Sequence, residues 1–334
     1  MADPERSSAS CPQRAPRQLG IIYNSQSGRH RRRWGRHPVP TDVPAIEAKR
    51  PEEIERAVTE LAALGVDTLA VAGGDGTVQC VLSHVLLGGL FETLPTLALV
   101  PTGSTNMTAR DVGFIDVRRR GWQPLIDWAA AGGMVAQATV ADHPVLRIQA
   151  SDSQAPICGM FFGVGAVHHA VQYTQENLHS KGLRGEAGPG LAFLRFLKSV
   201  ALQDQRHFAP TKIRLTDDAG HVVDDEALLM VASTLNRLVL SFHPFWGTED
   251  APLAWTTISQ TASRFLLRLP FVARGWSRRR PDAMESAGYV SHNSHELQLE
   301  FDDGFIVDGE FHRSRPGDGP VRLSVAGHVP FLSL

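Results

Sequence analysis

The stretch VAGGDGTV, residues 71–78, places three glycines around one aspartate directly behind small apolar residues. A tight turn between a strand and a helix needs positive φ values and a close approach of the backbone, and glycine permits both. The backbone N–H groups of such a turn point outward at the start of the helix, where the helix dipole favours an anion. The stretch therefore predicts a strand, a glycine turn and a helix, in that order, and the turn either binds a phosphate or only caps the helix.

Two further loops of small residues, NSQSG (24–28) and PTGST (101–105), also follow short apolar runs. The apolar runs predict strands at 18–23, 67–72 and 97–100. Helical spacing of apolar residues predicts helices at 51–65, 77–88 and 106–113. Such an alternation predicts a parallel sheet whose loops meet at one edge, where open α/β sheets bind their ligands.

The pattern changes at about residue 140, where short and partly alternating apolar runs lie between turns rich in Asp, Gly and Pro. We therefore predict an N-terminal α/β domain at 18–139 and a β-rich domain at 140–334, with one clear helix at 190–202. Residues 1–17 are polar and are expected to form a disordered tail.

The composition excludes several classes of protein. A net charge of -2 over 334 residues argues against a nucleic-acid partner. None of the four lysines lies in a Walker-type phosphate loop, and the protein-kinase motifs are missing. The three cysteines are widely spaced and provide neither a zinc site nor a disulfide framework, which suits a reducing compartment. Without a secretory signal or a long apolar run, we expect a soluble, cytoplasmic protein.

The motifs N-x-x-S-G, G-G-D-G-T and P-x-G-[ST]-x-N, followed near the C-terminus by VDGE (307–310), carry a resemblance. In this order they resemble the catalytic-domain family of diacylglycerol kinases, which includes bacterial lipid kinases and sphingosine kinases and is distantly related to NAD kinases. The resemblance runs from about residue 18 to the C-terminus. It implies an α/β nucleotide-binding domain, a C-terminal β-sandwich domain and an active site in the cleft between them. It also implies ATP and Mg²⁺ as cofactors and a lipid hydroxyl as the phosphate acceptor.

By position, the resemblance implies that the three loops bind the nucleotide. The residues concerned are Asn24, Ser27, Gly28, Gly73, Gly74, Gly76, Thr77, Gly103, Ser104, Thr105 and Asn106. Asp75 would bind magnesium or take the proton of the acceptor, while Asp308 and Glu310 would reach the reacting centre from the second domain. Which of these acids is the base stays open. Without the resemblance, VDGE would be interpreted as a hairpin turn after a strand.

The chain departs from the family pattern at three places. Met107 stands where most members have an acid, and APLAWTT (251–257) replaces a turn that holds a structural metal in some members. Only residues 29–49 separate the first loop from the next helix, so a full helix and a second strand are not expected there. These departures leave a catalytically inactive nucleotide-binding regulator as an alternative. An NAD kinase is less favoured, because the loop at 101–106 has the lipid-kinase form.

Two other segments stand out. The segment at 263–280 mixes large apolar side chains with six arginines. Such a surface would suit peripheral contact with an anionic membrane, for example the inner surface of the cell membrane. The alternative is that the segment forms a core helix that ends at Pro270. His168 and His169 follow an apolar run, and we expect them to point to opposite faces of a strand. The sequence says nothing about oligomeric state.

Overall fold

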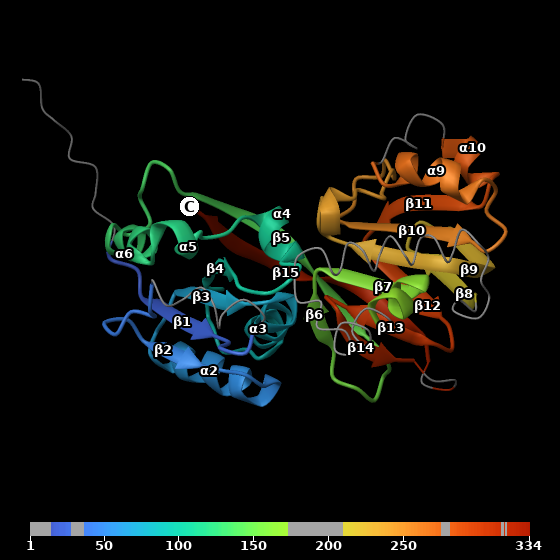
Figure 1. The fold of residues 1–334 in the computed structure, drawn as a ribbon. Coiled ribbons are helices and arrows are strands. Elements are labelled where there is room, and N and C mark those ends of the chain that lie inside the picture. Colours follow the sequence, from blue (N-terminus) through green and yellow to red (C-terminus); the bar gives the residue numbers. More distant parts are fainter. Residues whose placement is uncertain (1–14, 28–36, 173–209, 275–280, 315–316, 318) are drawn as a thin grey trace, which may run out of the picture.

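The computed structural model describes residues 15–27, 37–172, 210–274, 281–314, 317 and 319–334. Most of the expected tail, and the helix expected at 190–202, lie outside these residues. The chain forms two lobes, with the α/β elements in one and the antiparallel strands in the other (Figure 1). This arrangement confirms the predicted fold class, an α/β domain followed by a β domain.

Parallel strands in the order β2-β1-β3-β4 form the sheet of the N-terminal domain. They are β1 (Leu19–Tyr23), β2 (Ala45–Glu47), β3 (Thr68–Gly73) and β4 (Thr96–Pro101). The strands β1, β3 and β4 confirm the predictions from the apolar runs. The expectation of a missing second strand was wrong: β2 pairs with β1 over three residues, which is too short to give a clear signal in the sequence.

The helices of this domain are α2 (Pro51–Ala63), α3 (Asp75–Leu87), α4 (Met107–Val112), α5 (Val117–Arg120) and α6 (Gln123–Ala130). The helix α2 begins with Pro51 and two glutamates, which suit the first turn of a helix. Only one face of α2 is buried. In contrast, α3 is buried along most of its length, because the sheet lies on one side of it and the second domain on the other.

Antiparallel strands build the second domain. They are β5 (Thr139–Gln149), β6 (Ile157–Gly159), β7 (Phe161–Gly165), β8 (Thr211–Asp217), β9 (Val222–Ser233), β10 (Leu253–Ser259), β11 (Tyr289–Ser294), β12 (Glu296–Glu300), β13 (Gly304–Val307), β14 (Glu310–Arg313) and β15 (Val321–Ser333). Short helices accompany them: η2 (Val239–Ser241), α9 (Phe265–Val272) and α10 (Pro281–Glu285). In the described part of the chain, no helix is long and apolar enough to cross a membrane.

The long strands β5 and β15 run from one domain into the other. The first residues of β15 pair with β12, whereas Phe331 and Leu332 near its end pair with β4 in the parallel sheet. Along its length β15 also pairs with β5. The end of the chain therefore lies in the N-terminal domain, and the boundary at 139/140 stays a prediction because the sheet is continuous across it.

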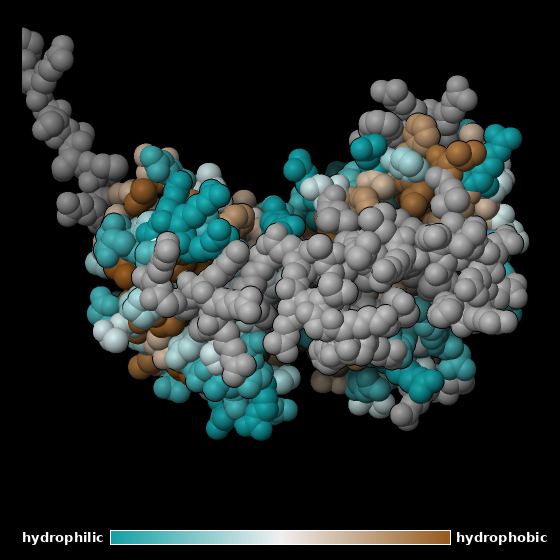
Figure 2. All heavy atoms as spheres, viewed as in Figure 1, coloured by the Kyte–Doolittle hydropathy of each residue, from teal (hydrophilic) through white to brown (hydrophobic). Residues whose placement is uncertain are grey.

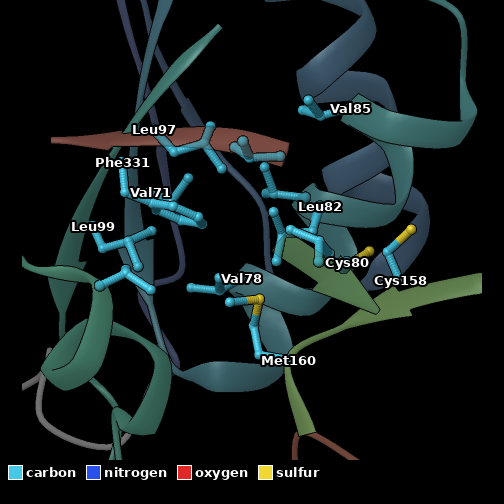
Figure 3. Close-up of a cluster of buried hydrophobic side chains, with 14 of the residues drawn as sticks. Val71, Val78, Cys80, Leu82, Val85, Leu97, Leu99, Cys158, Met160 and Phe331 are labelled. Atoms are coloured by element: carbon cyan, nitrogen blue, oxygen red, sulfur yellow. The ribbon is translucent and has the colours of Figure 1, made fainter. Parts of the chain in front are cut away.

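A single hydrophobic core joins the domains around α3. On α3, Val78 and Leu82 pack between strands of the parallel sheet and the region of Cys158 and Met160 from the second domain (Figure 3). Beside this core, the backbone N–H of Cys158 donates a hydrogen bond of 2.9 Å to Oγ of Ser83 on α3. Both domains thus hold α3, and the loop at its N-terminus is held with it.

We expect Leu82→Ala to lower the free energy of unfolding by about 2–5 kcal/mol, because it leaves a cavity in this core. Leu82 is fully buried, whereas Leu64, at the end of α2, is 57% exposed. The matched control Leu64→Ala should change the free energy by less than about 0.5 kcal/mol. Urea unfolding monitored by circular dichroism measures both; equal effects would contradict the assignment of this core.

Candidate active site

The three predicted loops meet at the carboxyl edge of the parallel strands. A Cβ atom at position 103 would lie 2.6 Å from Cα of Gly74, so these two loops touch through their backbones and leave no room for a side chain at Gly103. The backbone N–H of Thr102 donates to the carbonyl of Gly73 over 3.0 Å. From the first loop, the side-chain amide of Asn24 donates to Oγ1 of Thr77 over 3.4 Å. Gly28 lies outside the described residues.

Asn106 shapes the loop that precedes α4. Its backbone has a left-handed conformation with φ of 48°, which asparagine tolerates better than most residues. Its side chain accepts a hydrogen bond from the N–H of Gly103 and donates another to the carbonyl of Gly103, both at 2.8 Å. Asn106 is buried, while Ser104 at the tip of the loop is exposed. The asparagine therefore fixes the loop, and the tip faces outward.

Asp75 links two of the loops. Its carboxylate accepts a hydrogen bond of 2.7 Å from the hydroxyl of Thr105 and one of 3.1 Å from the backbone N–H of Thr108, in the first turn of α4. The side chain comes from the first residue of α3 and is almost fully buried. Asp75 thus holds the start of α3 against the start of α4. Thr108 had no signal in the sequence, because this contact depends on how the two helices approach each other.

The VDGE segment forms the turn of the β13–β14 hairpin. Asp308 and Gly309 have φ of 51° and 92°, as the two central residues of a type I′ turn require. The carboxylate of Asp308 accepts hydrogen bonds from the backbone N–H groups of Met160, at 2.9 Å, and Phe161, at 3.0 Å. The plain interpretation as a hairpin turn is therefore correct, and the aspartate additionally fixes the turn to the β6–β7 segment.

Burial raises the pKa of Asp308 to about 8. The negative charges of Asp75 and Glu310 act in the same direction, since each disfavours a second anion nearby. The two backbone N–H groups oppose the shift but are outweighed by the loss of solvent. The Asp308 carboxyl therefore holds its proton up to about pH 8.

Glu310 is exposed and lies beside the glycine loop of the first domain. A Cβ atom at position 76 would collide with Oε1 of Glu310 and would lie 3.3 Å from Cδ of the same side chain. Gly76 is thus the residue that lets the carboxylate approach the start of α3.

The structure brings together the three acids that the sequence singled out, but it gives them different surroundings. Asp75 and Asp308 are buried and hydrogen-bonded, whereas Glu310 is open to solvent.

Met107 occupies the position at which most members of the family have an acid. Its side chain is buried and belongs to the hydrophobic core between the domains. A carboxylate in these surroundings would lose its hydration, so the structure explains why an apolar residue suits this position.

Comparison with known proteins agrees with this geometry. Residues 18–130 match the model of the diacylglycerol kinase catalytic domain. The similarity to this family is thus shown for residues 18–130, which lie within the N-terminal domain. A YegS-like lipid kinase from Stenotrophomonas maltophilia (strain K279a) is 33% identical over 105 residues, which span 30% of this chain and 30% of that relative.

Solved structures extend the similarity in fold to both domains. A diacylglycerol kinase structure from Bacillus anthracis str. Sterne has a TM-score of 0.58 at 16% identity and covers 95% of this chain and 96% of its own. A second structure from that organism has a TM-score of 0.61 at 19% identity, covering 96% and 98%. At such identities, the similarity shows the fold alone. Asp308 and Glu310 lie beyond the matched diacylglycerol kinase catalytic domain, in the second domain.

We expect the free energy of unfolding to fall as the pH rises through the window set by Asp308. The folded chain keeps a proton that the unfolded chain loses, since the pKa is raised from 3.8 to about 8. This contribution is complete below the unfolded pKa and is lost as the pH rises through the folded pKa. Asp308→Asn cannot ionise, so it should flatten the decline, although it also weakens one backbone hydrogen bond.

Urea unfolding at a series of pH values between about 5 and 9 measures the slope. Asp302→Asn, which changes an exposed acid in the turn before β13, is the control and should keep the slope of the unmodified protein. An unchanged slope in Asp308→Asn would show that this carboxyl does not hold the proton.

Proposed function

We propose that the protein is an ATP-dependent lipid kinase that transfers the γ-phosphate of ATP to a lipid hydroxyl of the diacylglycerol or sphingoid type. The observation that carries the proposal is the exposed carboxylate of Glu310 beside Gly76, in the first turn of α3 directly after a phosphate-type loop. In the reaction, the hydroxyl oxygen forms a bond to the γ-phosphorus and its proton passes to Glu310. The bond from the γ-phosphorus to the bridging oxygen breaks, and ADP leaves.

The loops fit the phosphates of a nucleotide. The two glycine loops meet backbone to backbone at the start of α3, where N–H groups and the helix dipole favour an anion. Phosphoryl transfer requires mainly positioning and charge stabilisation, so these loops can serve without a lysine. Ser27, Ser104 and the glycines at 73, 74, 76 and 103 are the proposed contacts, with Asn24, Thr77, Thr105 and Asn106 holding them.

Magnesium would be held by Asp75. An ionised carboxylate has about four lone-pair positions, and two donors occupy two of them in Asp75. The remaining positions suit a hard cation that prefers oxygen ligands. When bound, magnesium would neutralise charge on the phosphates.

Glu310 is the proposed base because the other two acids are poorly suited. Asp308 is buried and keeps its proton to about pH 8. Asp75 is engaged by Thr105 and Thr108. Besides the magnesium ion proposed above, Asp75 holds the loops together, and Asp308 holds the hairpin that presents Glu310.

An inactive nucleotide-binding regulator is the main alternative, since the same loops would bind ATP without transfer. The accessible Glu310 favours the kinase, because a regulator has no need of a carboxylate at this position. Incubation with γ-labelled ATP, magnesium and a panel of diacylglycerols, sphingoid bases and isoprenoid alcohols tests the proposal. Labelled lipid supports the kinase; ATP binding without transfer to any acceptor favours the regulator.

We expect Glu310→Gln to lower turnover by about 100- to 10,000-fold, the usual contribution of a positioned base. The affinity for ATP should hardly change, because Glu310 acts on the acceptor. Glu300→Gln, at an exposed position on β12, should keep full activity. Turnover on the best acceptor and calorimetric ATP binding are the measurements, and a fully active Glu310→Gln variant would remove Glu310 from the mechanism.

We further propose that α9 contacts an anionic membrane from which the lipid is taken. Leu267 is 70% and Phe271 51% exposed, and the exposed Arg264 and Arg274 lie at the two ends of the same helical stripe. Figure 2 shows apolar surface at the α9 end of the second domain. The expectation of a core helix ending at Pro270 was wrong, because α9 continues to Val272 and the side chains of Leu267 and Phe271 are exposed to solvent. Apolar side chains between arginines suit an anionic bilayer.

We expect Leu267→Ser combined with Phe271→Ser to reduce binding to phosphatidylserine-containing vesicles at least about tenfold, since burying each side chain is worth about 1.5–3 kcal/mol. Val222→Ser, at a 59% exposed position on β9, is the control. Vesicle sedimentation at low and high salt measures the effect, and salt should weaken binding of the unmodified protein. If vesicle binding changes neither with the substitutions at Leu267 and Phe271 nor with salt, α9 is not the surface that contacts the membrane.

A further inference from the structure

Two histidines and one aspartate form a cluster at the end of β13 opposite to Asp308. The expectation that His168 and His169 point to opposite faces of a strand was wrong: residues 166–172 are helical and the two rings touch, with centroids 5.1 Å apart. Asp303, in the turn between β12 and β13, completes the cluster. Sequence spacing gave no sign of it, because Asp303 lies far along the chain.

The donor atoms converge. One ligand atom from each of His168, His169 and Asp303 can be chosen so that all lie within 4.8 Å of one another. Nε2 of His169 is 3.8 Å from Oδ2 of Asp303. Hydrogen bonds from the hydroxyl of Thr211, at 2.5 Å, and from the N–H of Gly304, at 2.7 Å, hold the carboxylate in place. The position of this carboxylate is therefore fixed by two elements other than the histidines.

His168 has a buried ring nitrogen without a hydrogen-bond partner. Among the described residues, nothing donates to or accepts from its Nδ1. The ring lies against Gly304, where a Cβ atom would overlap it, and against Phe311, with centroids 5.4 Å apart. A polar nitrogen in this position is costly unless something satisfies it.

We propose that His168, His169 and Asp303 bind one transition-metal ion, with zinc as the best match. Two imidazoles and one carboxylate are typical protein ligands of four-coordinate zinc, with water in the fourth position. Magnesium and calcium prefer oxygen ligands and match this set poorly. Ligand atoms around zinc lie about 3.4 Å apart, so small side-chain rotations would close the cluster on an ion.

The ion would join the helix that follows β7 to the turn that begins β13. β13 lies between Asp303 and Asp308, which are five residues apart, so at about 3.3 Å per residue this site is about 16 Å from Asp308. It is therefore separate from the nucleotide loops, and its role would be to fix the base of the hairpin that carries Glu310. The inference does not depend on kinase activity.

Metal binding by the untagged full chain tests the inference. After removal of metal with EDTA, the protein is titrated with Co²⁺ and followed by its visible absorption, and the zinc retained after dialysis is measured by mass spectrometry. We expect one equivalent of zinc and the strong visible bands of a tetrahedral Co²⁺ site. His169→Gln and Asp303→Asn should each weaken binding at least about 10- to 100-fold.

His295→Gln, which changes an exposed histidine in the same domain, is the matched control and should keep full binding. Circular dichroism would verify that the variants fold. Absence of stoichiometric zinc in the unmodified protein would overturn the site, as would folded His169→Gln and Asp303→Asn variants that bind zinc like the unmodified protein.

Discussion

The packing of α3 between the two domains is the constraint on which the site depends. One side of α3 covers the parallel sheet, and Val78, Leu82 and their neighbours meet Cys158 and Met160 of the second domain (Figure 3). The loop that opens α3 is therefore held from both sides. Because β6 and β7 are fixed to α3, and Asp308 is fixed to the β6–β7 segment, the β13–β14 hairpin arrives beside Gly76. Without this core, the positions of Glu310 and of the glycine loop before α3 would not be fixed relative to each other.

The three acids at this junction differ in their surroundings more than in their chemistry. Donors from protein groups surround Asp75 and Asp308, while Glu310 stands at the surface. Burial raises the pKa of Asp308, so that two anions rather than three lie close together near neutral pH. Keeping one carboxyl neutral reduces repulsion at a site that is proposed to receive the phosphates of a nucleotide.

Local patterns were enough to predict the loops and most of the first domain. The strands β1, β3 and β4 and the helices that follow them depend on apolar periodicity and glycine turns, which are visible in short windows. The pairing of β15 with β4 could not be predicted, because it depends on the twist and length of two strands far apart in sequence. The separate roles of Asp75, Asp308 and Glu310 also depend on backbone donors that no sequence pattern displays.

The central claim, that Glu310 faces Gly76 across the domain junction, can be tested with an engineered disulfide in a Cys11→Ser background. A cysteine at position 310 would place its sulfur at about the position of Cγ of Glu310, which lies 3.5 Å from the position of a Cβ on residue 76, so a sulfur on that Cβ can reach it with an S–S bond of about 2.05 Å. The measurement is the rate of oxidation of the Gly76→Cys, Glu310→Cys protein, followed by peptide mapping. We predict rapid formation of a bond between these two positions, while the control pair Gly76→Cys, Glu300→Cys stays reduced. A folded Gly76→Cys, Glu310→Cys protein that cross-links no faster than the control would contradict the account.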